Sequence, residues 1–383
     1  MTTATDSTGL KMRLTAMLLT AIMPVAAYAA EVRRIADYPP DDWHSSWDDV
    51  LAGVDAPEDW EKRREELRAK FLELIRDQHK PARPSLELQI HETAIVDDCY
   101  ERRLVSYQVE PGERARAFIG LPLGLKGKAP GVVALHGTFE RGIEQAAGLV
   151  DNPEKAYLDH LCRRGYVVIA PEHFVSGERV PPEGRYDTTR FYQKHPEWTA
   201  VGKFTYEHSI AVDILASMPE VDANRLGVMG HSLGGQGAIF LAAYDERLKA
   251  AVSNCAAAFF RHNPGVEHWA RDHWYVYFKH IRPGLLKGEL PPIDFHEIIA
   301  LVAPRAFLDV SALNDGRVDV QRQRVLMLTS LMSVWELNDA AQNFAFFVHG
   351  REHSVPHESR ELIYGWLDAQ LKEPIAPSSP PRE

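Results

Sequence analysis

The sequence predicts an α/β fold with a mostly parallel central sheet that helices flank on both faces. From residue 131 onward, short apolar runs recur along the chain, and helical stretches separate most of them. The runs are residues 131–135, 166–170, 226–229, 250–254, 306–310 and 344–348. Continuous apolar strands of this kind are buried on both faces, which is typical of a parallel sheet between layers of helices.

Composition supports a large globular protein and argues against several other classes. The chain has 383 residues, of which 45% are hydrophobic and 25% are charged. These ordinary proportions exclude a fibrous, collagen-like or wholly disordered chain and supply ample material for a core. The formal net charge is −11. Because nucleic-acid binders usually present a basic face, we expect no nucleic-acid partner. The oligomeric state stays open.

The region before the apolar runs is expected to hold an irregular arm, a helix and three strands. Residues 31–56 are rich in Pro, Trp and Asp and suggest the arm. Pro57 opens a stretch to about Gln78 with apolar residues at three- and four-residue spacing, which predicts a helix. Three β-like runs follow at residues 86–96, 100–109 and 115–121. Further helices are expected over residues 204–217, 234–243, 318–331 and 359–371.

Residues 1–29 have the pattern of a secretory signal peptide. Lys11 and Arg13 precede an apolar stretch, and Ala27-Tyr28-Ala29 matches the small-x-small pattern of a cleavage site. The stretch is shorter than the roughly 20 residues that a membrane-spanning helix needs. We therefore expect cleavage, export to the periplasm or the outside, and no stable membrane insertion. Translation could start at Met1 or at Met12.

These patterns divide the chain into a signal peptide and one large domain with additions. We expect an N-terminal arm and helix over residues 30–85 and the large domain over residues 86–372. An insertion at about residues 259–292 interrupts that domain, and residues 373–383 are expected to form a disordered tail.

The clearest signal for chemistry is the pattern G-x-S-x-G at Gly230-His231-Ser232-Leu233-Gly234. It lies between an apolar strand and a helical run, where such a pattern forms a sharp turn that exposes the serine hydroxyl. Glycine lets the strand and the helix approach closely, and the helix N-terminus favours negative charge beside the serine. A serine between glycines could also be a simple turn, but the flanking elements favour Ser232 as a nucleophile.

A serine nucleophile needs a base, and the base needs an orienting carboxylate. Asp315 is the favoured carboxylate because it follows the strand expected over residues 304–311. Asp309 lies inside that strand and Asp319 begins the next helix, so both are less well placed. Asn-Asp-Gly is also a good turn sequence, which leaves a structural alternative for Asp315.

Three histidines after the last strand compete for the role of base. His353 lies in the middle of a loop and is favoured, and His349 at the strand end is second. His357 follows Pro356, which suits the first turn of the final helix. Their regular spacing could indicate a metal site on one helix face, but Gly350 and Pro356 argue against a continuous helix. We expect no metal and no cofactor.

The oxyanion of an acyl-transfer reaction needs two backbone N–H donors. Leu233 follows the serine directly and is the first candidate. The strand over residues 131–135 ends in His136-Gly137, so Thr138 is the favoured second donor, with Phe139 as an alternative. An ordinary glycine turn is the simpler explanation of this second segment.

The cysteines add little. Cys99, Cys162 and Cys255 allow at most one disulfide and show no metal-binding pattern. Cys255 lies in an apolar run and is expected to be a small buried hydrophobic residue.

Together these motifs resemble the α/β-hydrolase superfamily, and within it the dienelactone-hydrolase-like and acetylxylan-esterase-like serine esterases. The resemblance spans about residues 115–372. Segments 135–138, 227–235, 313–318 and 353–368 carry it. It implies an α/β-hydrolase fold with an N-terminal helical extension and a cap-like insertion. It also implies ester hydrolysis through an acyl-enzyme, with Ser232, Asp315 and His353 as the catalytic triad.

The chain differs at several points from the families that it resembles. Dienelactone hydrolases proper use a cysteine nucleophile, whereas Ser232 stands here. Glucuronoyl esterases place a lysine four residues after the serine, where this chain has Gln236. Oligopeptidases carry a large N-terminal propeller, for which the residues before the first matched strand are too few.

Aromatic residues in two segments could shape a substrate pocket. Trp198 lies in the segment 174–203, and Trp269 and Trp274 lie in the insertion. They could stack on sugar rings, or they could pack the insertion onto the domain. The resulting prediction is a secreted serine esterase whose partner is a small-molecule or carbohydrate ester. The alternatives are a serine peptidase that acts on short peptides and a non-catalytic binding protein with the same fold.

Overall fold

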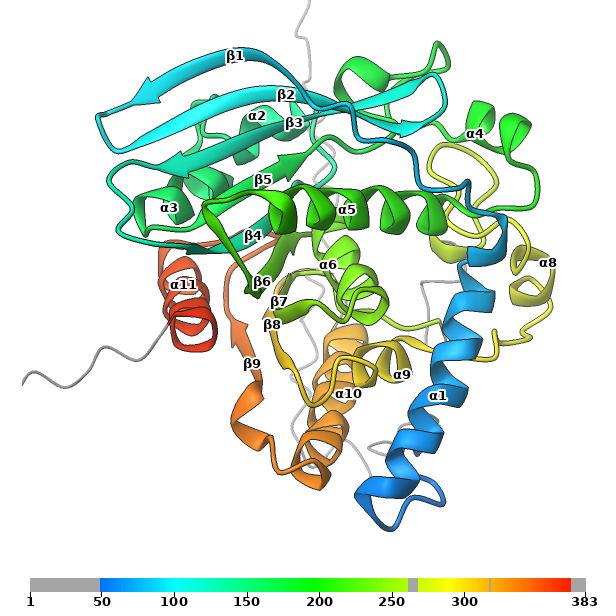
Figure 1. Ribbon diagram of the computed structural model, residues 1–383. Helices are drawn as coiled ribbons and strands as arrows, with labels where there is room; N and C mark the ends of the chain where they lie inside the picture. The colour runs from blue at the N-terminus through cyan, green and yellow to red at the C-terminus, as the bar shows by residue number, and fades with distance from the viewer. Residues whose placement is uncertain (1–48, 261–267, 317, 373–383) are drawn as a thin grey trace, which may run out of the picture. The chain divides into compact units, whose positions relative to one another are not determined.

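The computed structural model describes residues 49–260, 268–316 and 318–372 (Figure 1). The expected signal peptide and the expected tail lie outside these residues. Within them, one sheet has the strand order β1-β2-β3-β5-β4-β6-β7-β8-β9. The mixed, mostly parallel sheet with flanking helices confirms the predicted fold class.

The antiparallel part of the sheet is formed by the first three strands. They are β1 (Gln89–Val96), β2 (Tyr100–Glu110) and β3 (Glu113–Pro122). β3 continues the antiparallel pairing onto β5. β1 is exposed along nearly its whole length, so this edge contributes little to the core.

The remaining strands are parallel and carry the predicted apolar runs. They are β4 (Ala129–Leu135), β5 (Val167–Pro171), β6 (Val221–His231), β7 (Leu248–Asn254), β8 (Ala306–Ala312) and β9 (Phe344–His349). β6 begins at Val221, before the run at residues 226–229, and its residues 222–225 are partly or fully exposed. Since parallel strands share their direction, the carboxyl ends of β4, β6, β7, β8 and β9 open toward one edge.

Two separate hydrophobic clusters fill the two faces of the sheet. Along β4, Val133 and Leu135 belong to one cluster, and Val132 and Ala134 belong to the other. This alternation follows from the period of two in a strand. The parallel core is therefore apolar on both sides, as the continuous runs predict.

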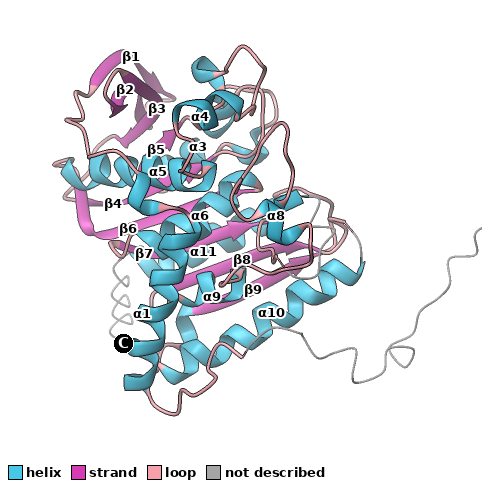
Figure 2. Ribbon diagram, turned by 90° about the vertical axis from the view of Figure 1, so that its right-hand side faces the viewer, coloured by secondary structure: helices cyan, strands magenta, loops and turns pink. Residues whose placement is uncertain are grey.

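Helices complete each cluster. One face is covered by α1 (Pro57–Leu74), α5 (Ala200–Ser217), α6 (Leu233–Tyr244), α9 (Phe295–Ala300) and α10 (Val318–Leu337). The other is covered by α2 (Gly142–Ala146), α3 (Tyr157–Arg163) and α11 (His357–Leu371). Figure 2 shows α5, α6 and α9 in front of the strands that they cover. None of the described helices combines the length and apolar character that crossing a bilayer requires.

Short helices and 3-10 turns lie in the connections between the longer elements. These are α4 (Thr189–Lys194), α8 (Arg282–Leu285) and the 3-10 turns η3 (Asp77–His79), η4 (Pro153–Lys155), η5 (Gly177–Arg179) and η6 (Ala341–Asn343). The predicted N-terminal helix is thus α1 followed by η3. It packs on the domain, where Phe71 stacks on Phe240 of α6 with ring centroids 6.1 Å apart.

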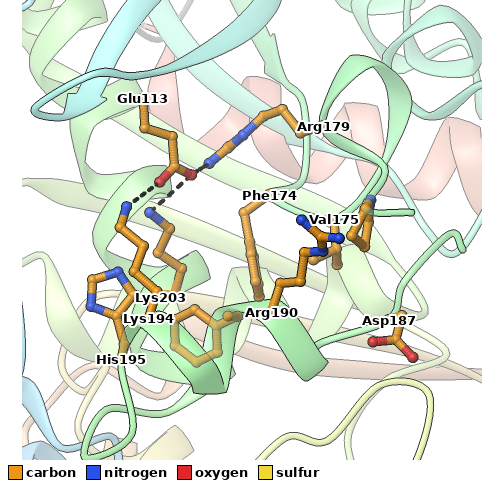
Figure 3. A pocket seen from close by; sticks show the side chains of 11 residues that line it. Glu113, Phe174, Val175, Arg179, Asp187, Arg190, Lys194, His195 and Lys203 are labelled. Atoms are coloured by element: carbon orange, nitrogen blue, oxygen red, sulfur yellow. Dashed lines mark hydrogen bonds and ion pairs between the residues drawn. The ribbon is translucent and has the colours of Figure 1, made fainter. Parts of the chain in front are cut away.

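Buried ion pairs fasten the segment after β5 to the domain (Figure 3). Arg179 donates to both carboxylate oxygens of Glu207 on α5, at 2.5 and 2.7 Å, and also contacts Glu113. Lys203 joins the same carboxylates and Glu110. A cavity of about 260 Å³ lies beside them. Because an unpaired buried charge is costly, these contacts tether Arg179, and with it the segment after β5, to α5 and β3.

Candidate active site

Ser232 lies at the sharp turn between β6 and α6. Its backbone has φ 57° and ψ −121°, a strained conformation for a residue with a side chain. The Ser232 N–H donates to the carbonyl oxygen of Asn254 at the end of β7, at 2.9 Å. The structure therefore places the predicted nucleophile in the geometry that G-x-S-x-G produces between a strand and a helix.

Glycine is required on both sides of this turn. A Cβ atom on Gly230 would lie 2.2 Å from the carbonyl oxygen of Gly234. A Cβ atom on Gly234 would lie 2.2 Å from the carbonyl oxygen of Leu135 at the end of β4. Both separations are far below van der Waals contact, so no other residue fits without moving the backbone.

Asp315 and His353 meet across the loops that follow β8 and β9. His353 Nδ1 lies 2.7 Å from Asp315 Oδ2. Burial alone would raise the pKa of Asp315, but the hydrogen bond and charge of His353 outweigh it and lower that pKa below its usual value. Asp315 is thus held as a carboxylate, which fixes the orientation of the imidazole.

The competing residues are placed differently. His349 ends β9, and its Nδ1 accepts the N–H of Arg351. His357 begins α11, as its position after proline predicts. Asp309 is fully buried inside β8, where Ser311 donates to it. The side chain of Asp319 lies outside the described residues.

The imidazole of His353 lies beside the turn that carries the serine. Its ring centroid is 4.5 Å from that of His231, the residue before Ser232. His353 is partly exposed, whereas His231 is buried and is held by Asn254 through a 2.6 Å contact of Nδ1. The structure therefore places an imidazole oriented by Asp315 next to His231, the residue that precedes Ser232.

The loop after β4 carries both candidates for the second N–H donor, Thr138 and Phe139. Phe139 cannot serve, because its N–H donates to the hydroxyl of Tyr186 at 2.9 Å. For the N–H of Thr138, no hydrogen bond is found among the residues that the structure describes. Leu233 begins α6, where the first N–H groups of a helix have no partner within it. Thr138 and Leu233 therefore remain the candidate oxyanion donors.

Tyr186 holds this loop and was not identified from the sequence. Its hydroxyl accepts the Phe139 N–H and donates toward the carbonyl oxygens of Phe139, at 2.9 Å, and Gly137, at 3.3 Å. Tyr186 itself is buried and lies in the segment that the ion pairs of Arg179 anchor. The sequence shows only a tyrosine in a Pro- and Gly-rich segment, and no local pattern reveals a contact with a loop 47 residues away.

Buried histidines beneath the turn carry no charge at neutral pH. Burial lowers the pKa of His136 to about 4 and those of His208 and His231 to about 3. His173 is likewise buried, and its Nε2 contacts the hydroxyl of Tyr275 at 2.9 Å. These histidines therefore bring no positive charge to the site, so stabilisation of an oxyanion there falls to N–H dipoles.

The structure buries two of the three tryptophans that were predicted to contact the substrate. Trp198 and Trp269 are each 2% exposed and pack among other aromatic rings, so neither offers a ring face to a ligand. Trp274 is 43% exposed. Its ring lies 6.2 Å from that of Tyr186. The Tyr186 hydroxyl in turn contacts the loop after β4, residues 136–139, which we call the oxyanion loop.

The sheet, the strained serine and the oriented imidazole define an α/β-hydrolase. The comparison with protein families agrees, because residues 116–260 match the dienelactone hydrolase family. That segment includes Ser232 and Thr138. The chain therefore has the α/β-hydrolase fold, and residues 116–260 are similar to the dienelactone hydrolase family, as the sequence resemblance predicted.

Individual relatives are distant. The chain is 28% identical over 210 residues to the putative hydrolase YtaP of Bacillus subtilis (strain 168), covering 53% of this chain and 66% of that protein. It is 29% identical over 136 residues to the carbohydrate esterase MZ0003 of an unknown prokaryotic organism, covering 32% of this chain and 30% of that protein. The match therefore spans less than two thirds of each of these relatives. A solved glucuronoyl esterase from Solibacter usitatus has the same fold, with a TM-score of 0.68 and 21% identity over 85% of this chain and 98% of that chain.

We predict that Tyr186→Phe slows hydrolysis of p-nitrophenyl acetate about tenfold in kcat with little change in KM. The variant keeps the ring but releases the oxyanion loop, and small misplacements near reacting atoms cost about this much or more. Steady-state kinetics on purified protein provide the measurement.

Tyr192→Phe is the matched control for this experiment. Tyr192 is also buried, and its hydroxyl donates to the carbonyl oxygens of Val276 and Tyr277 rather than to the oxyanion loop. It should lose comparable stability and keep its kcat. An equal fall in kcat in both variants would show that Tyr186 acts only on the stability of the fold.

Proposed function

We propose that this protein is an exported serine esterase that hydrolyses an ester carried by a carbohydrate. The observation that carries the proposal is the strained turn at Ser232 together with His353, which Asp315 holds at 2.7 Å and whose ring packs against the adjacent His231. This arrangement supports proton removal from the serine hydroxyl. The N–H groups of Leu233 and Thr138 are the candidates to stabilise the charge that develops on the substrate.

In the proposed reaction, Ser232 Oγ attacks the ester carbonyl while His353 takes the hydroxyl proton. The N–H groups of Leu233 and Thr138 bind the oxyanion of the tetrahedral intermediate. His353 then gives its proton to the departing alcohol, which leaves an acyl-enzyme. A water molecule, deprotonated by His353, attacks this ester and releases the acid, after which the serine regains its proton. Asp315 orients the imidazole and stabilises its charged form throughout.

The carbohydrate part of the proposal rests on the relatives and on one exposed side chain. One curated relative is named a carbohydrate esterase, and the solved structure is a glucuronoyl esterase. Trp274 offers an exposed indole next to Tyr186, and aromatic rings commonly pack on apolar ring faces of ligands. Gln236, four residues after the serine, is an amide rather than a lysine, so the proposal covers carbohydrate esters in general.

The first test is covalent labelling of Ser232 by a fluorophosphonate. In the wild-type protein, Ser232 Oγ should displace fluoride from the probe and become phosphonylated. Ser232→Ala should show no labelling and no esterase activity. Ser354→Ala is the matched control, because Ser354 lies in the His353 loop and, within the described residues, its hydroxyl donates to the carbonyl oxygen of Glu352 alone. Unlabelled wild-type protein without esterase activity would contradict the proposal and favour a binding protein. Faster cleavage of aminoacyl amides than of esters would favour a peptidase.

We predict that Trp274→Ala raises KM for an acetylated or uronate-esterified oligosaccharide about fivefold, because stacking on one aromatic ring is worth about 1 kcal/mol. Kinetics with p-nitrophenyl acetate, which has no sugar, should stay near the wild-type values. Leu290→Ala, at another exposed apolar residue of the insertion, serves as the control. An unchanged KM for every sugar ester would remove Trp274 from the substrate site.

The proposed export has its own test. The basic, apolar and small-x-small pattern of residues 1–29 supports cleavage by a signal peptidase. N-terminal sequencing of protein from the extracytoplasmic fraction should begin at Ala30. Recovery of the intact N-terminus from the cytoplasm alone would contradict export.

A further inference from the structure

We infer that Cys255, Asp315 and His353 form a site for a soft divalent cation such as Zn²⁺, and that its occupation switches the hydrolase off. The switch rests on the proposed function, because it acts on the same imidazole. Nothing in the sequence motifs assigns such a site.

The three side chains meet because their loops follow neighbouring parallel strands. Cys255 follows β7, Asp315 follows β8 and His353 follows β9. One ligand atom from each residue lies within 4.8 Å of the other two. Backbone contacts hold the cysteine in place, since its N–H donates to Val310 at 2.7 Å and its thiol lies 3.7 Å from the carbonyl oxygen of Ser354.

A thiolate, an imidazole and a carboxylate are the donor set that Zn²⁺ prefers. Zinc binds these atoms at about 2.0–2.3 Å, which sets tetrahedral ligand atoms about 3.3–3.8 Å apart. The ligand atoms lie within 4.8 Å of one another, and the 2.7 Å separation of His353 Nδ1 and Asp315 Oδ2 must open as the metal enters. His353 can make this adjustment, because its side chain is 43% exposed and lies on a loop. Three protein ligands leave the fourth position to water.

Cation binding must displace a proton from Cys255. Burial, followed by the charges of Asp315 and Asp309, raises the pKa of this thiol to about 12, so the metal-free protein holds it as a thiol. Coordination replaces that proton with the metal, forms a sulfur–metal bond and releases H⁺ to solvent. Without metal, Cys255 is therefore not a competing nucleophile, which separates it from Ser232.

Coordination would disable the proposed acid–base pair. A metal coordinated by His353 and Asp315 replaces the hydrogen bond between them. It also occupies the imidazole that would otherwise accept the serine proton. The cation would inhibit without occupying the serine itself. Inhibition should therefore be reversed by a chelator.

Metal binding is tested first in Ser232→Ala, which has no nucleophile. Titration of this chelator-washed protein with Co²⁺ should produce a near-ultraviolet thiolate-to-cobalt charge-transfer band. Zn²⁺ should displace the Co²⁺ and remove the band. Cys255→Ser in the same background should lose it, and Cys99→Ser, at a cysteine on the far turn after β1, should keep it. A band that survives Cys255→Ser, or no band at all, would overturn the site.

Inhibition is then measured in the active protein, with each variant compared with its own metal-free rate. The Zn²⁺ concentration for half-inhibition of p-nitrophenyl acetate hydrolysis should rise at least about tenfold in Cys255→Ser, because even outer-shell changes cost about 10- to 100-fold in metal affinity. Cys99→Ser should match the wild type. Equal sensitivity in Cys255→Ser would overturn the switch. If Ser232 fails to label with the fluorophosphonate, the proposed function is contradicted, while the cobalt band still decides whether the site binds metal.

Discussion

The turn at Ser232 exists because β4, β6 and α6 approach one another more closely than any side chain would allow. A Cβ on Gly230 or Gly234 would lie 2.2 Å from a backbone oxygen. This close approach puts the serine in a conformation that costs about 1–3 kcal/mol. The hydrogen bond from Ser232 N–H to Asn254 and the complete burial of most of α6 hold the turn in place.

The same approach places the other groups of the site. Gly234 touches the end of β4, so the loop with Thr138 begins next to the helix start that carries Leu233. The two N–H groups therefore come from segments that the glycine contact ties together. Tyr186 closes the loop from its other side, and the Arg179 ion pairs hold the segment that carries Tyr186. The oxyanion donors thus depend on packing that extends well beyond the two residues themselves.

Much of the fold could be predicted from the sequence because the parallel strands are buried on both faces. Burial forces continuous apolar runs, and those runs are visible without a structure. The turn at Ser232 was predictable for a similar reason, since its steric demand requires glycine at fixed positions. Asp315 and His353 follow strands directly, so their proximity could be expected from the shared direction of the strands.

The remaining features depend on contacts that leave no local trace. A tyrosine whose hydroxyl holds a distant loop has the same local sequence as a tyrosine in solvent, so Tyr186 was missed. The aromatic residues of the insertion could not be sorted by sequence, because packing alone decides that Trp269 is buried and Trp274 is exposed. Cys255 was expected to be buried and is buried, but its two polar neighbours arise from the order of β7, β8 and β9.

The order of β7, β8 and β9 bears on metal binding as well as on catalysis. Strand ends that converge on one edge concentrate polar side chains there, and a third side chain beside an Asp–His pair changes what the pair can bind. An apolar residue in place of Cys255 would leave a hydrogen-bonded pair with only two donor atoms, too few for a stable zinc site. The thiol adds the third donor while its raised pKa keeps it protonated and inert in the metal-free protein. A single side chain can therefore couple this hydrolase site to soft metal ions without altering the proposed chemistry of Ser232.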